Sequence, residues 1–148
     1  MIVLLIHLAS TWFMTGLIWF VQVVHYPLFN QVGESVFSRY ETIHTQSTTW
    51  VVGPVMLAEL FSAGWLLWLA PEGIPGWKLW AGAGLLGIVW VSTALLQVPQ
   101  HGILASGFDQ RAYETLVSTN WIRTVGWSLR GLLALWMLWD LLSPVEGG

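Results

Sequence analysis

The run IVLLIHLASTWFMTGLIWFVQVV, residues 2–24, contains no charged residue. A helix needs about 20 mostly apolar residues to cross a hydrocarbon core of about 30 Å, and this run is long enough. Three later stretches have a similar length and character, at residues 50–69, 79–96 and 121–142. Four such runs predict an all-α integral membrane protein, with residues 1–148 forming a single transmembrane domain folded as a four-helix bundle.

The composition agrees with a protein whose surface faces lipid. Of the 148 residues, 55% are hydrophobic and only 9% are charged, whereas soluble domains contain roughly 25% charged residues. Many of the twelve Trp residues lie near the ends of predicted spans, where indole rings favour the membrane interface. We therefore expect the lipid bilayer as the main partner. The net charge of −3 argues against a nucleic-acid partner, and the absence of Cys excludes thiolate metal ligands.

Four alternating spans place both termini on one side of the membrane, which we call the terminal side. The opposite side carries His25, His44 and His101, and we call it the histidine side. Both connections on the histidine side are long, and residues 36–44 and 112–117 have apolar side chains at helical spacing. We expect two short amphipathic helices there, on one face of the bundle.

The two halves of the chain share short sequence similarities. QVVH (residues 22–25) resembles QVPQH (residues 97–101), and YETI (residues 40–43) resembles YETL (residues 113–116). Such matches indicate a duplicated helical hairpin, with chance similarity as the alternative. A parallel repeat would place equivalent residues at equal depth around one axis.

The three histidines on the histidine side are the candidate metal ligands. Histidine is the most common metal ligand in proteins. If the repeat relates His25 to His101, their rings can approach one central point and hold a haem iron. With His44 and Glu59 added, the set instead suits a non-haem transition metal with nitrogen and oxygen ligands. The alternative is that these rings lie at the interface and are satisfied by water and the backbone.

Four further polar residues map to the same side and are candidate cofactor-binding groups. Gln22 and Gln97 lie one helical turn before His25 and His101, so their side-chain carbonyls can accept a ring N–H. Asn120 and Arg123 begin the last span and are expected to hold polar groups of a substrate or the propionates of a haem.

Two opposite charges lie deep inside predicted spans. Glu59 and Arg130 are each about ten residues from the histidine side of their span, which is roughly 14 Å. Because an ionised group at this depth is costly unless it is paired, we expect them to be partners. They are the candidate catalytic residues, orienting a substrate or moving protons. The alternative is an ion pair that only fixes helix packing.

The distribution of basic residues indicates an orientation. Arg39, Arg111 and Arg123 lie on the histidine side, against Lys78 on the terminal side. The excess of basic residues on cytoplasmic segments then predicts a cytoplasmic histidine side.

Several segments resemble a family of small, uncharacterised bacterial four-helix membrane proteins. The resemblance covers most of the chain and is carried by these motifs: WFMTG (residues 12–16), HYPLF (25–29), PVMLAE (54–59), QVPQH (97–101), GFD (107–109) and TNWIRT (119–124). Asn120 and Arg123 at the start of the last span are also remotely similar to the anthrone-oxygenase-like membrane family. The first resemblance implies a bacterial inner membrane, and the second implies oxidative chemistry.

These observations together predict a membrane redox protein or oxidoreductase that binds a metal or haem on the histidine side and acts on a small hydrophobic substrate. Two other classes stay open. One is a small-molecule or proton-coupled carrier that uses the Glu59–Arg130 pair. The other is a structural subunit that packs against a membrane-protein partner or a second copy of this chain.

Overall fold

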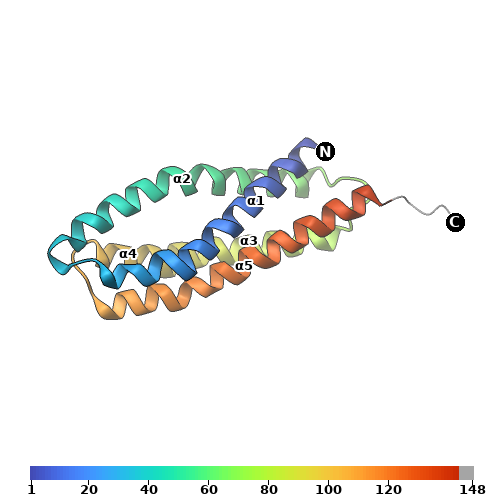
Figure 1. Cartoon of the computed structure of the whole chain (residues 1–148). Coiled ribbons are helices and arrows are strands. Elements are labelled where there is room, and N and C mark those ends of the chain that lie inside the picture. Colours follow the sequence, from blue (N-terminus) through green and yellow to red (C-terminus); the bar gives the residue numbers. More distant parts are fainter. Residues whose placement is uncertain (144–148) are drawn as a thin grey trace.

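The computed structural model describes residues 1–143, and this part of the chain contains helices and no strand. The helical elements, in chain order, are α1 (Ile2–Phe20), η1 (Val21–His25), η2 (Tyr26–Gln31), α2 (Glu34–Trp68), α3 (Gly76–Ser92), η3 (Thr93–Gln97), α4 (Val98–Leu104) and α5 (Gln110–Leu142). They form four long antiparallel rods, with α3, η3 and α4 making one rod (Figure 1). Each rod is long and apolar enough to cross a membrane, so the predicted four-helix membrane bundle is confirmed.

The start of α1 and the end of α5 lie at the same end of the bundle, together with the α2–α3 connection (Figure 1). The structure differs from the prediction on the two amphipathic segments. Residues 36–44 and 112–117 are helical, but they are the first turns of α2 and α5 rather than separate short helices. No Gly or Pro lies in the polar residues 45–49, so nothing ends the helix before the span begins. At 35 residues α2 is roughly 50 Å long and exceeds the thickness of the hydrocarbon core.

The first and the third membrane crossing each contain a π-helical turn near the histidine side. One is η1 and the other is η3, and each ends two residues before a proline, Pro27 or Pro99. Proline lacks the N–H that would continue an α-helical ladder, and π turns absorb such a mismatch. Aligned on these turns, the two halves pair His25 with Gln97. His101 therefore lies about one helical turn beyond the position that is structurally equivalent to His25.

Apolar side chains lie on the surface of the bundle and charged ones lie inside it, the reverse of a soluble protein. Large apolar side chains cover the outside, and Trp50 and Trp68 are 82% and 84% exposed. Glu59, Arg130 and Asn120 are buried. Lipid accepts an apolar surface, whereas ionisable groups in a membrane face the bundle interior. The surface thus matches a bundle surrounded by lipid.

The closest helix contact that a glycine permits lies between α3 and α5. A Cβ atom added to Gly126 would lie 2.8 Å from the Val89 Cγ2 atom, which is too close for the branched and stiff valine side chain to avoid. Trp127, next in the chain, is fully buried in the middle layer of the core with Val89. Gly126 therefore sets the distance between α3 and α5.

We predict that Gly126→Ala destabilises the protein by about 1–3 kcal/mol, the usual cost of overpacking. Gly87→Ala is the matched control, because a Cβ atom there meets nothing within 4 Å, and it should cause no loss. Thermal unfolding in mild detergent measures both effects. Val89→Ala in the Gly126→Ala background should recover stability, and failure to do so would show that the contact with Val89 is not the cause.

Candidate functional site

The three predicted histidines come together at the histidine end of the bundle. His25 ends η1, His44 lies in α2 and His101 lies in α4. The Nε2 atom of His25 is 3.0 Å from Nδ1 of His44, and the ring centroids of His44 and His101 are 5.6 Å apart. No hydrogen bond joins His25 to His101 within residues 1–143. His44 thus lies between the other two rings, which is a different arrangement from the expected pair facing one central point.

A glutamate that the sequence analysis did not select completes the cluster. Glu41 lies one turn before His44 in α2 and is fully buried. Its Oε1 atom is 2.5 Å from Nδ1 of His101, while its Oε2 atom has no hydrogen-bond partner among the described residues. One donor atom from each of Glu41, His44 and His101 lies within 4.8 Å of the others. Three converging donors and one unsatisfied buried oxygen are the features of a cation site.

A chain of hydrogen bonds continues from this cluster into α5. The Tyr26 hydroxyl lies 3.1 Å from Nε2 of His101 and accepts a hydrogen bond from Nη2 of Arg123 at 3.1 Å. Nε of Arg123 donates to Oδ1 of Asn120 at 2.8 Å, and Nδ2 of Asn120 donates to Oε1 of Gln22 at 2.8 Å. The structure therefore brings Asn120 and Arg123 into the same polar network as His101, although neither touches a histidine ring.

Gln22 and Gln97 do not contact the histidine rings, contrary to the expectation for acceptors of a ring N–H. Oε1 of Gln22 accepts from Asn120, and Oε1 of Gln97 accepts from the Ser92 hydroxyl at 3.0 Å. Each glutamine is instead held by a partner in α5, Gln22 by Asn120 and Gln97 by Thr119. Both glutamines are buried and bridge helices.

A cavity of about 650 Å³ lies beside the cluster. It is bounded by α2 on one side and by α3, η3 and α4 on the other, with α1 and α5 completing the wall. His44, His101, Tyr26 and Arg123 line its polar part. This volume is in the range of small-molecule pockets in proteins. His25 does not line this cavity and faces a smaller pocket on the other side of His44.

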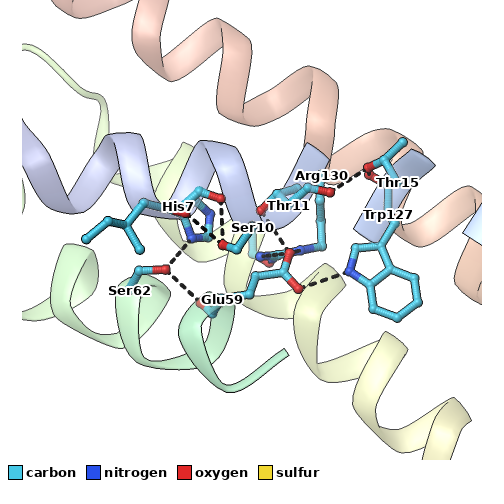
Figure 2. A network of polar contacts seen from close by, with 10 residues as sticks. His7, Ser10, Thr11, Thr15, Glu59, Ser62, Trp127 and Arg130 are labelled. Carbon is cyan, nitrogen blue, oxygen red and sulfur yellow. Dashed lines mark hydrogen bonds and ion pairs between the residues drawn. The ribbon is translucent and has the colours of Figure 1, made fainter. Parts of the chain in front are cut away.

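Glu59 and Arg130 form the predicted ion pair (Figure 2). Nε and Nη2 of Arg130 both lie 2.9 Å from Oε1 of Glu59, with the Nε–H aligned for a hydrogen bond. Thr11 donates to the same oxygen at 2.8 Å, and Nε1 of Trp127 donates to Oε2 at 3.0 Å. Nη1 of Arg130 donates to the Gly82 carbonyl. The pair does not line the cavity, and its position supports a structural role more directly than the predicted catalytic one.

Glu41 and Tyr26 are the residues that sequence reasoning missed. The signal for Glu41 was its spacing, since Glu and His three residues apart lie on one helix face and recur in metal-binding bundles. Tyr26 carried no such signal, because its partners lie 75 and 97 residues away in the chain.

Comparisons of this chain with protein families, curated proteins and solved structures find no match. Function is therefore inferred from the geometry of the site.

We predict that Glu59→Gln and Arg130→Met each strongly lower the stability in detergent, and that the double variant loses less than the sum of the two. Removing one partner leaves the other charge buried and unpaired, which costs roughly 3–5 kcal/mol. Thermal unfolding of all four proteins gives the coupling energy. Arg39→Gln, on the exposed surface, is the control and should be neutral. Additive losses would show that the pair does not interact.

Proposed function

We propose that this protein is a membrane-embedded redox protein, an oxidoreductase with a non-haem metal ion held by Glu41, His44 and His101. The observation that carries the proposal is the buried Glu41 carboxylate. One of its oxygens contacts His101 and the other has no partner within residues 1–143. An unpaired buried carboxylate oxygen is costly, and a cation bound between it and the two imidazoles would remove that cost.

The donor set indicates the metal class. Two imidazoles and one carboxylate with open positions are typical of non-haem Fe(II) oxygenases, although the same set also occurs at catalytic zinc. The adjoining cavity favours redox chemistry over hydrolysis, because most of its wall is apolar and an apolar substrate offers few bonds to hydrolyse. The remote resemblance to the anthrone-oxygenase-like membrane family supports the same class of chemistry.

A haem is the less favoured cofactor. Axial ligation by two histidines requires two rings that face each other from opposite sides of the porphyrin, whereas His44 lies between His25 and His101. His25 is instead suited to orient His44, since a ring nitrogen of each lies 3.0 Å from the other. A second group on the free ring nitrogen of a ligand is the usual arrangement at metal sites.

The carrier and subunit alternatives have less support. Both oxygens of Glu59 accept hydrogen bonds from Thr11, Trp127 or Arg130, and the pair does not line the cavity, so its position favours a structural role over transport of a proton or cargo. We further propose a bacterial inner membrane with the histidine side in the cytoplasm, on the basis of the basic residues on that side.

We predict about one transition-metal ion per chain after the protein is purified in mild detergent, reconstituted with Fe(II) without oxygen and desalted. Elemental analysis measures the metal, and an absorption spectrum without a Soret band separates a non-haem ion from haem. Glu41→Gln, His44→Ala and His101→Ala should each lower metal affinity by at least about tenfold, since even second-shell changes cost roughly 10–100-fold.

The matched control is Glu114→Gln, which changes the glutamate of the second YET motif. Glu114 is exposed and accepts a hydrogen bond from Gln110 instead of facing a histidine, so its variant should keep the metal. His25→Ala should also retain it, more weakly. A Soret band lost on His25→Ala, or equal metal content in Glu41→Gln and Glu114→Gln, would contradict the proposal.

A further inference from the structure

The cavity beside the Glu41–His44–His101 cluster has a mostly apolar wall with one group of ionisable side chains. Tyr26, His44, His101 and Arg123 form this group, next to the Glu41 carboxylate. The other polar residues of the wall are Gln97 and threonines. The rest of the wall is mainly apolar and includes the following side chains: Met14, Ile18, Val52, Met56, Trp90 and Trp127. A ligand that matches this wall has a single small polar head and a long or broad apolar body.

The guanidinium of Arg123 favours a ligand whose polar head is negatively charged. The buried cations Arg130 and Lys78 each have a carboxylate partner. Arg130 lies 2.9 Å from Glu59, and Lys78 lies 2.5 Å from Asp140. Arg123 is half-buried, and the acceptors that it reaches, the Asn120 amide oxygen and the Tyr26 hydroxyl, are neutral. Its Nη1 atom has no acceptor in the described part of the chain. A guanidinium in an apolar setting without a counter-ion favours an anionic ligand.

Part of the cavity wall reaches the flank of the bundle. Leu57 in α2 and Val98 in α4 both line the cavity, and they are 46% and 59% exposed. Both belong to rods that are long and apolar enough to span a membrane, so an entrance between them would face lipid. A ligand dissolved in the bilayer could enter there without passing through water.

We propose that the cavity binds one long-chain fatty acid, with its carboxylate at Arg123 and its hydrocarbon chain along the apolar wall. Carboxylates and phosphates are the anions that arginine N–H groups bind, and Nη1 is the nitrogen of Arg123 that is left to donate. A single-chain carboxylate is smaller than a two-chain phospholipid and suits a cavity of about 650 Å³ better. The idea that this fatty acid is the substrate of the metal site rests on the function proposed above. Binding of the fatty acid depends only on the cavity and Arg123. The class of ligand is therefore testable without the metal.

The test measures binding of radiolabelled oleate and of oleyl alcohol, which has the same chain and no charge, to the full-length protein in mild detergent. Empty micelles provide the background. We expect one saturable oleate per chain, with oleyl alcohol at least about tenfold weaker, the size of a lost charged hydrogen bond. Arg123→Gln should remove this preference, and Arg123→Lys should keep part of it. Arg111→Gln, at an exposed arginine in the same helix, should leave it unchanged.

A second pair of variants tests the location. Gly53 lines the cavity, and a Cβ atom there meets nothing within 4 Å, so Gly53→Phe should fill the space and abolish binding of both ligands. Gly64→Phe, on the exposed surface of the same helix, should preserve it. Gel filtration confirms that each variant is folded and monodisperse.

Three results would overturn the proposal: equal affinity for oleate and oleyl alcohol, an unchanged preference in Arg123→Gln, or oleate binding that survives Gly53→Phe. Displacement of oleate by equimolar phosphatidylglycerol would also overturn it, because the occupant would then be a phospholipid. Glu41→Gln keeps the two proposals separate, since it should lose metal and still bind oleate. Normal oleate selectivity in a protein that never binds metal would contradict the proposed function alone.

Discussion

An ionised side chain inside hydrocarbon needs a partner within the protein. Glu59 and Arg130 are such partners, and their contacts reach every helix of the bundle. Glu59 lies in α2 and Arg130 in α5, Thr11 of α1 donates to Glu59, and the Gly82 carbonyl of α3 accepts from Arg130. One buried network therefore connects all four helices near their middle. Because each contact is short and directional, the network fixes how far each helix can slide or rotate. The arrangement of the histidine end depends on that register.

The histidine end differs from this central network in what it leaves unsatisfied. In the central network every carboxylate oxygen has a protein partner. Near the histidines, Glu41 retains a buried oxygen without a partner in residues 1–143, and Arg123 has only neutral acceptors. Buried polar groups in native proteins are almost always satisfied. The unpaired oxygen of Glu41 is best explained by a bound cation, and the half-buried guanidinium of Arg123, which has only neutral acceptors, by a bound anion.

The two proposals describe two parts of a single binding site. An entrance between α2 and α4 would face lipid, the apolar wall accommodates a chain, and Arg123 holds the head beside the proposed metal. The apolar surface of the protein is suited to surrounding lipid, and in this proposal the bilayer also supplies the ligand. His25 and His101 occupy different positions relative to the π turns before Pro27 and Pro99, since His25 ends its turn and His101 lies four residues beyond the other. His101 reaches Glu41, and His25 reaches His44.

The fold class, the four crossings and the pairing of Glu59 with Arg130 could all be predicted from the order of the residues. Hydrophobic run length and the cost of a lone charge in lipid are properties that composition and depth reveal. The sequence also indicated that His25, His44 and His101 gather on one side. Which of them lie together became clear from the packing of the helices. Glu41 meets His101 across 60 residues of chain, and Gln22 and Gln97 bond to Asn120 and Thr119 of α5 instead of the histidine rings. Neither event has a local signal, since both depend on how helices pack against one another.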